Sequence, residues 1–226
     1  MIKEFEKRVL SSLILIPIAF FFIIQGSVFF ILFLSMLFLA TSYEWLKMNK
    51  RNNLIMFLGI FFLLFSFYTA YLLRLEKGIV IFLFVILISI LTDVGGYFFG
   101  KTFKGPKLTK ISPNKTYAGV FGSFIFSFVG GLIFIEYSSH INFSMLSFFK
   151  GFEKIGINYD LSIFIIIFSI STISQVGDLT ISYFKRKAKI KGTGKLLPGH
   201  GGFLDRMDGI IYSVPFAYLI FTINYY

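Results

Sequence analysis

Three aspartates beside long apolar segments are the residues in this sequence whose types and spacing could do chemistry. Asp178 falls near the end of one apolar run, and Asp205 and Asp208 stand three apart at the start of another. This spacing puts Asp205 and Asp208 on one face of a helix, and Mg²⁺ is typically held by one or two carboxylates together with phosphate oxygens. Acids at the start of a helix also serve as ordinary caps. We favour the metal interpretation, because two of the acids directly follow a Gly-rich turn.

Acidic residues inside apolar runs predict a buried polar site. A carboxylate at the centre of a membrane helix costs about 2.5–3.5 kcal/mol, so Asp93 and Asp178 need a protein interior or water around them unless they lie at the membrane boundary. Asp178 also belongs to a stripe of polar residues with helical spacing, which predicts one inward-facing side of a helix. The stripe consists of Ser171, Ser174, Gln175, Asp178 and Ser182, and Lys185 continues it. Hydrogen bonding between helices is the alternative role of such a stripe.

Two segments rich in Lys and Gly, 100–116 and 184–208, could bind phosphates. Glycine lets backbone N–H groups approach an anion and lysine supplies compact positive charges, so a ligand with several phosphates is expected. A loop that only faces lipid headgroups is the alternative for segment 100–116. Neither segment contains the GxxxxGK[ST] pattern of P-loops. His200 lies in a Pro-Gly-His-Gly-Gly turn beside the acids and could bind phosphate, transfer a proton or bond the loop.

The composition requires membrane helices to position these residues. Of the 226 residues, 56% are hydrophobic and 15% are charged, whereas soluble domains carry roughly 25% charged residues. A span needs roughly 20 apolar residues, and seven runs are of about this length. They cover about 9–25, 27–46, 54–73, 78–99, 117–137, 161–184 and 209–226. The expected fold class is an all-α polytopic membrane bundle of about seven transmembrane helices. It forms a single integral-membrane domain over 1–226, with N-terminal spans in 1–90 and a catalytic half in 91–226.

Three local features refine this expectation. Pro17 and the short break at Gly26 leave open a re-entrant hairpin instead of two N-terminal spans. Tyr43, Glu44 and Trp45 at the end of the second run resemble a belt at the membrane interface. A small residue at every fourth position of the fifth run predicts close helix packing, within the subunit or at a dimer contact. These small residues are Gly119, Ser123, Ser127 and Gly131.

The distribution of Lys and Arg predicts the orientation. If the N-terminus is in the cytoplasm, 18 of the 22 basic residues fall in cytoplasmic segments and four fall outside. This asymmetry predicts an N-in, C-out protein, and it explains most of the net charge of +11 without a nucleic-acid partner. The chain has no cysteine, which excludes thiolate chemistry and Cys-based metal sites.

Three segments resemble phosphatidate cytidylyltransferases, also called CDP-diacylglycerol synthases. Residues 182–208 resemble the family signature that begins S-x-apolar-K-R-x4-K-D and ends H-G-G-apolar-x-D-R-x-D. The D-x-x-G-Y-x-x-G-K run that starts at Asp93, followed by Ser-Pro-Asn-Lys-Thr at 112–116, is similar to a second family segment. Gln-Val-Gly-Asp-Leu at 175–179 is similar to a third. The resemblance covers about residues 90–210.

The resemblance implies transfer of a cytidylyl group from CTP to phosphatidate, with release of diphosphate, at the cytoplasmic side of a bacterial inner (plasma) membrane. It implies Mg²⁺ as cofactor, held by Asp178, Asp205 and Asp208, and leaves open a second metal or a monovalent cation. The implied catalytic residues are Asp178, Asp205, Asp208, Lys185, Arg186 and His200. The implied substrate-binding residues are Lys115, Thr116, Ser182, Lys191, Gly199, Gly201, Gly202, Arg206 and Asp93. The expected partners are CTP, phosphatidate and the lipid bilayer, and the resemblance suggests a homodimer.

The chain departs from the family pattern at three positions, each of which loses a carboxylate. Gly192 stands in place of an Asp, and Ile181 and Ala118 stand where Glu is often found. Because the three aspartates of the expected metal site all remain, we expect an active enzyme.

A transporter for an anionic solute is the alternative function, because several spans with acidic residues would allow it. The sequence shows no internal repeat, which many transporters contain. A CDP-alcohol phosphatidyltransferase is disfavoured, because the D-G-x2-A-R motif of that family is absent. A non-catalytic scaffold is disfavoured as well, because it gives no reason for three acids near a His-Gly-Gly turn.

Overall fold

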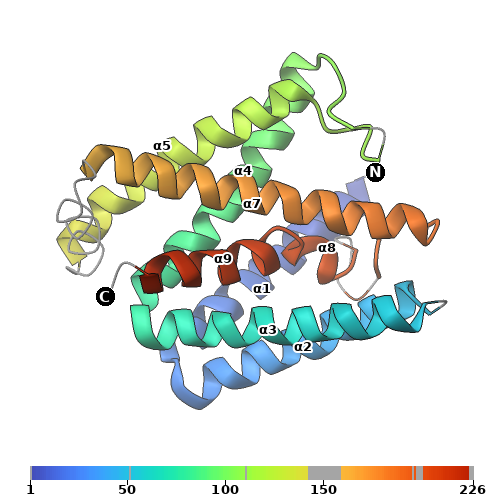
Figure 1. Cartoon of the computed structure of the whole chain (residues 1–226), viewed down its shortest axis with the longest axis horizontal. Helices are drawn as coiled ribbons and strands as arrows, with labels where there is room; N and C mark the ends of the chain where they lie inside the picture. The colour runs from blue at the N-terminus through green and yellow to red at the C-terminus, as the bar shows by residue number, and fades with distance from the viewer. Residues whose placement is uncertain are drawn as a thin grey trace.

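The computed structural model in Figure 1 describes the backbone of residues 2–50, 52–109, 111–141, 159–194, 196 and 201–223, and side chains in these ranges apart from 2–12 and 139–160. Its helices are α1 (Ile2–Gln25), α2 (Ser27–Met48), α3 (Asn53–Lys77), α4 (Ile79–Phe103), α5 (Tyr117–Ile141), α7 (Tyr159–Lys187), α8 (Leu204–Met207) and α9 (Ile210–Ile223). The predicted all-α class is confirmed, because all the named elements among the described residues are helices.

Each of the seven predicted apolar runs coincides with one helix, as far as the run lies within the described residues. Five of these helices are long and apolar enough to cross a membrane: α2, α3, α4, α5 over Tyr117–Ser138 and α7 over Leu161–Lys187. The apolar part of α1, Leu13–Gln25, is shorter, and α9 has 14 residues. The protein is therefore a multi-pass membrane protein, and spans by α1 and α9 stay predictions.

The break between α1 and α2 is a tight turn at Gly26. This residue has φ 65°, in the left-handed region that favours glycine. The guanidinium of Arg74, on α3, fills the space beside it, because a Cβ at Gly26 would lie 2.5 Å from Arg74 Nη2. Arg74 Nε also donates a hydrogen bond of 2.8 Å to the Ile23 carbonyl, which lacks a helical partner at the end of α1. The first two runs are thus two helices joined by a turn that α3 fastens.

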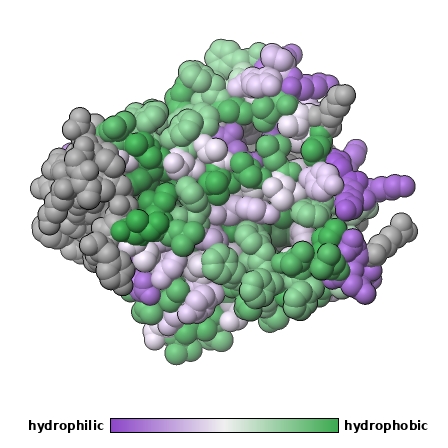
Figure 2. Space-filling model, viewed as in Figure 1, coloured by the Kyte–Doolittle hydropathy of each residue, from purple (hydrophilic) through white to green (hydrophobic). Residues whose placement is uncertain are grey.

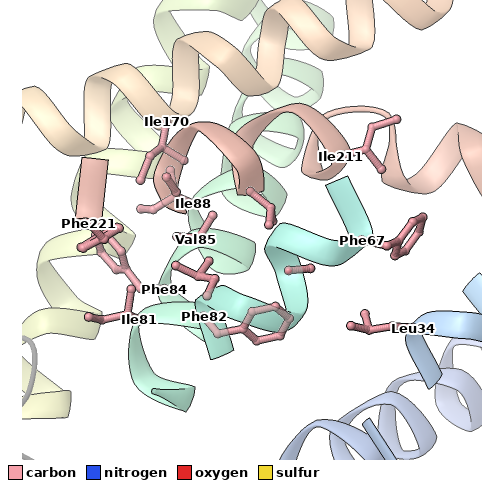
Figure 3. Close-up of a cluster of buried hydrophobic side chains, with 14 of the residues drawn as sticks. Leu34, Phe67, Ile81, Phe82, Phe84, Val85, Ile88, Ile170, Ile211 and Phe221 are labelled. Carbon is pink, nitrogen blue, oxygen red and sulfur yellow. The ribbon is translucent and has the colours of Figure 1, made fainter. Parts of the chain in front are cut away.

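The core lies where α3, α4, α7 and α9 meet (Figure 3). Large apolar side chains of α4 face Ile170 of α7 and Phe221 of α9. Lipid tails are as apolar as these side chains, so helix association in a membrane depends on close packing and hydrogen bonds between helices. Such bonds join α3 to α9 through Ser66 Oγ and the Ile211 carbonyl (2.8 Å), and α4 to α9 through the Ser89 and Ser213 hydroxyls (2.7 Å).

Helices α4 and α5 approach each other through glycine. A Cβ at Gly95 would lie 2.4 Å from the Gly122 carbonyl oxygen, and one at Gly119 would lie 2.8 Å from the Gly96 carbonyl oxygen. Ser123 Oγ donates to the Thr92 carbonyl at 2.7 Å. The small-residue stripe of α5 therefore packs against α4 within the subunit, which was one of the two predicted alternatives.

The polar ends of the helices gather on one side of the molecule. Hydrophilic side chains collect mainly at the end where α2, α4 and α7 finish, while apolar side chains cover the middle (Figure 2). The loop between α4 and α5 and the segment that leads from α7 to α8 lie at this same end (Figure 1). The fold thus brings together the two Lys- and Gly-rich segments, which are far apart in the sequence.

Candidate active site

Two glycines bring α7 close to the segment that carries Asp208. A Cβ at Gly177 would lie 2.5 Å from the Asp208 carbonyl oxygen, and one at Gly209 would lie 2.3 Å from Ser174 Oγ. Bare backbone at these points allows α7 and the start of α9 to pack side by side (Figure 1). Asp178, next to Gly177, is consequently near enough to Asp208 to act on it electrostatically.

The inward-facing stripe predicted for the sixth run is confirmed on α7. Ser171, Ser174, Ser182 and Lys185 are all buried. The Ser171 hydroxyl accepts a hydrogen bond from Thr92 of α4 at 2.8 Å, and Ser182 Oγ donates to Asp178 Oδ1 at 3.3 Å. The end of the stripe at Ser171 therefore serves helix packing, and the end near Asp178 belongs to the site.

Lys115 reaches Asp178 from the loop between α4 and α5. The Lys115 Nζ and Asp178 Oδ2 atoms are 2.5 Å apart. The loop is fixed locally, because the Leu108 N–H donates to the Lys115 carbonyl at 2.8 Å and Thr116 Oγ1 accepts from the Gly119 N–H at 3.1 Å. Thr116 is thus the N-cap residue of α5, and this cap together with the backbone bonds of Lys115 fixes the backbone from which the Lys115 side chain extends.

A polar cavity of about 280 Å³ opens beside this ion pair. Its walls come from α4, α5, α7 and the loop before α5. The polar residues that line it include Asp93, Ser112, Asn114, Lys115, Thr116, Gln175 and Asp178. Gln175 Nε2 is buried and has no hydrogen-bond partner among the described residues, so it is a donor available to a bound molecule.

Asp208 and Lys185 form the buried floor of the site. Lys185 Nζ lies 3.9 Å from Asp208 Oδ2, and Asp208 Oδ1 accepts the Gly209 N–H at 3.0 Å. Burial, and then the neighbouring Asp178 carboxylate, raise the pKa of Asp208 well above its usual range, although Lys185 opposes this. Asp93 also contributes to this negative surrounding. The arrangement concentrates more negative charge than Lys185 alone neutralises.

Asp205 points into the loop rather than toward Asp178. Its Oδ1 accepts from Lys185 Nζ at 3.0 Å, and its Oδ2 accepts from the Thr193 N–H at 2.8 Å and the Gly202 N–H at 3.3 Å. Burial raises the pKa of Asp205, but the bonds from Thr193 and Lys185 outweigh it, so the pKa lies below its usual value. Both oxygens of this carboxylate are engaged by the protein itself, whereas sequence analysis expected it to hold a metal with Asp208.

Glu44 is a residue of the site that sequence analysis missed. It is 1% exposed and Trp45 is buried, so the interfacial-belt interpretation is wrong for both, while Tyr43 at 57% exposure fits it. The Glu44 carboxylate accepts hydrogen bonds from the Thr193 hydroxyl and from the backbone at the start of α8. The available signal was a carboxylate close to the end of an apolar run, the same signal that drew attention to Asp93.

The other predicted residues are distributed around this group. Arg186 is exposed and donates to the carbonyls of Ile111 (3.3 Å) and Ile190 (3.1 Å), so it ties the loop before α5 to the end of α7. Lys191 is exposed. Gly201 has φ 90°. A Cβ added at Gly201 would lie 3.3 Å from Asp205 Oδ2, and so would a Cβ added at Gly192. Gly199 and His200 lie outside the described residues.

An apolar cavity of about 440 Å³ lies on the other side of α8. It is lined by residues from α1, α2, α3, α4 and α9, and Phe203, Arg206 and Met207 form its border near the site. Arg206 also interacts electrostatically with Asp93 in the polar cavity. Arg206 therefore borders the apolar cavity, and its charge acts on Asp93 in the wall of the polar cavity.

The donor set suits a divalent cation that substrate would complete. Asp178 and Asp208 come together from two segments, and each is opposed by a lysine ammonium. Mg²⁺ prefers this chemistry, one or two carboxylates completed by phosphate oxygens and water. In the described part of the chain, no three acidic or histidine side chains are close enough to hold a metal ion by themselves.

Comparison with known proteins agrees with this architecture. The model of the cytidylyltransferase family matches residues 52–224. The chain is 36% identical to a phosphatidate cytidylyltransferase of Haemophilus influenzae over 189 residues, which cover 78% of this chain and 61% of that protein. It is 31% identical over 217 residues to the phosphatidate cytidylyltransferase of Rickettsia felis, covering 94% of this chain and 90% of the relative. The Rickettsia prowazekii protein of the same name is 31% identical over 223 residues, covering 97% and 91%. The chain therefore belongs to the cytidylyltransferase family, together with these phosphatidate cytidylyltransferases.

Proposed function

We propose that this protein is a phosphatidate cytidylyltransferase, which converts CTP and phosphatidate to CDP-diacylglycerol and diphosphate. The observation that carries this proposal is the convergence of Asp178, Asp208, Lys115 and Lys185 beside a polar cavity, with an apolar cavity bordered by Arg206 on the other side of α8. A water-soluble nucleotide and a lipid phosphate have to meet at such a boundary. Family membership and the names of the relatives support the same reaction and leave the transporter alternative without support.

The chemistry asks mainly for positioning and charge neutralisation. A phosphatidate oxygen attacks the α-phosphorus of CTP in line, a new P–O bond forms, and the bond to the β-phosphate oxygen breaks as diphosphate leaves. The attacking phosphate is already anionic at neutral pH, so no strong base is needed. The barrier comes from bringing two highly negative groups together, which fixed cations and donors lower.

The residues of the polar cavity would bind the phosphates. Lys115 would exchange its contact with Asp178 for a phosphate oxygen, and Gln175 Nε2 would donate to another. Lys185, held by Asp205, would neutralise phosphate charge from the buried side of the site. Thr116 would keep its cap and Ser182 would orient Asp178. Asp93 would accept a hydrogen bond from a hydroxyl or amino group of the substrate.

The Gly-rich segment would close the other side of the phosphates. The backbone N–H groups at Gly199 and Gly201 would donate hydrogen bonds to phosphate, with His200 beside them. The Gly202 N–H would join them by giving up its hydrogen bond to Asp205 Oδ2. Roles for Arg186 and Lys191 in holding phosphate stay predictions from the signature. The phosphatidate acyl chains would occupy the apolar cavity, with the lipid phosphate near Arg206.

Mg²⁺, held by Asp178 and Asp208, would supply charge neutralisation for the phosphate oxygens and the leaving diphosphate. In an assay with α-³²P-labelled CTP, we expect label in chloroform-soluble lipid only when phosphatidate and Mg²⁺ are both present. EDTA should abolish incorporation, and added Mg²⁺ should restore it.

The position of the label is the control for the reaction type. CTP labelled at the γ-phosphate should give no labelled lipid, because that phosphate leaves as diphosphate. Labelled lipid from γ-labelled CTP, or full activity in EDTA, would contradict the proposed metal-assisted cytidylyl transfer.

We also propose seven spans, with the site at the cytoplasmic side of a bacterial inner membrane. Because the chain has no cysteine, single cysteines can report the side directly. In intact bacterial cells, a membrane-impermeant maleimide should label Lys77→Cys, at the end of α3. It should label Lys187→Cys, at the end of α7, only after lysis. The opposite pattern would reverse the orientation.

A further inference from the structure

We propose that Glu44 is a positioning residue for the proposed reaction. Its carboxylate fastens to helix α2 the two sides, Thr193 and Phe203 with Leu204, of the segment that contains the Gly-rich turn. This inference rests on the proposed function. Glu44 lies eight positions before the part of the chain that matches the family model, residues 52–224. Its carboxylate nevertheless contacts the segment that contains the Gly-rich turn.

Three donors from the two sides of this segment converge on Glu44. Thr193 Oγ1 donates to Glu44 Oε2 at 2.7 Å, from the side that follows α7. The Leu204 N–H donates to Oε2 at 2.9 Å and the Phe203 N–H to Oε1 at 3.1 Å, from the side that begins α8. Backbone N–H groups at a helix start have no helical partner, so a buried carboxylate is a strong acceptor for them.

Two of the glycines in this segment, Gly194 and Gly202, lie against the same carboxylate. A Cβ at Gly194 would lie 2.5 Å from Glu44 Oε1, and a Cβ at Gly202 would lie 2.3 Å from Oε2. The glycines therefore serve the close approach of the segment to α2 as well as contact with phosphate. This approach joins residues 44 and 204, which are 160 positions apart.

The tether continues to the acids and lysines of the site. Thr193 gives its hydroxyl to Glu44 and its N–H to Asp205 Oδ2. Asp205 in turn holds Lys185, which reaches Asp208. Loss of the Glu44 bonds would therefore release both the backbone donors and the placement of Lys185. A displacement of about 1 Å in such groups can lower turnover about 100-fold.

The test compares Glu44→Gln with Glu76→Gln in the full-length, detergent-purified protein. Gln has nearly the same shape, but its NH₂ group opposes an N–H donor. Glu76 makes one exposed hydrogen bond, with Tyr218, far from the site along α3, so it is a matched control. We expect Glu44→Gln to lower kcat/KM for CTP about 10- to 100-fold, with KM for phosphatidate unchanged, and Glu76→Gln to leave both unchanged.

Thr193 supplies a rescue test and hydrogen exchange supplies a readout independent of activity. Thr193→Val should lower kcat/KM for CTP, whereas Thr193→Ser, which keeps the hydroxyl, should leave it near the value of the unmodified protein. When Glu44→Gln is already present, adding Thr193→Val should lower kcat/KM for CTP only slightly further. Amide exchange in peptides that span 201–207 should be faster in Glu44→Gln than in Glu76→Gln.

Each outcome decides the inference. Unchanged amide exchange in Glu44→Gln would overturn the tether, and faster exchange with normal kcat/KM would overturn its positioning role. An equal loss in Thr193→Ser and Thr193→Val would also overturn it. If the unmodified protein makes no labelled lipid while exchange behaves as expected, the proposed reaction falls and only the tether remains.

Discussion

Replacing Asp208 by asparagine is expected to lower cytidylyl transfer at least about 1,000-fold while the protein stays folded in the membrane. Asp208 is buried beside Asp178, and its Oδ1 already accepts the Gly209 N–H, a bond that the Asn oxygen can keep. Asp208 would be ionised when it holds Mg²⁺, so the substitution removes this ligand charge and hardly changes the local packing. Without this charge, the pair of carboxylates proposed to hold Mg²⁺ is lost, and with it the neutralisation of the transferring phosphates.

The measurement is initial rate against Mg²⁺ concentration for the unmodified protein and Asp208→Asn. The residual activity of the variant should require a higher Mg²⁺ concentration for half-maximal rate. Elution as a single species in detergent is the control for folding. Near-normal turnover with an unchanged Mg²⁺ requirement would remove Asp208 from the metal site.

Replacing Asp205 by asparagine is expected to lower turnover by about 100-fold or more, for a different reason. Its Oδ1 holds Lys185, and its Oδ2 accepts two backbone N–H groups on the two sides of the Gly-rich turn. Asparagine keeps one oxygen acceptor, so either the Lys185 contact or the two backbone contacts are lost along with the charge. Breaking an ion pair that is largely buried costs several kcal/mol at the site, because the partner charge is left uncompensated.

The two aspartates can be separated by the same assay. For Asp205→Asn we expect a raised KM for CTP with an unchanged Mg²⁺ requirement, since the variant disturbs Lys185 and the backbone donors. A Mg²⁺ requirement that rises as much as in Asp208→Asn would show instead that Asp205 is a ligand of the metal. Near-normal activity of Asp205→Asn would contradict both roles.

Helix-level features were predictable because they depend on residues that are near in sequence. The apolar runs found the long helices, and the spacing of Ser174, Gln175 and Asp178 showed which face of α7 turns inward. The small-residue stripe of α5 indicated close packing, but its partner, α4, required the structure. The approach of Asp178 to Asp208 depends on α7 and α9 packing side by side, which required the structure.

The loop contacts were not predictable, because they depend on the orientation of side chains across the fold. Asp205 and Asp208 are three apart, yet one engages the loop while the other turns to α7, since α8 is a single turn. Glu44 meets Thr193, which lies 149 positions later, and no local pattern contains that distance. Gly199 and His200 lie outside the described residues, so their roles stay predictions.

The glycine-mediated contact of α4 with α5 has a consequence for motion during turnover. With backbone against backbone at Gly95 and Gly122, sliding or rotating one helix against the other would make backbone atoms overlap, so we expect the two helices to move together as one rigid body. Asp93 of α4 and Thr116 at the start of α5 both line the polar cavity, so the distance between these two cavity walls should stay fixed. Any widening that admits a nucleotide or releases diphosphate must therefore come from α7 or the connecting loops shifting against this frame.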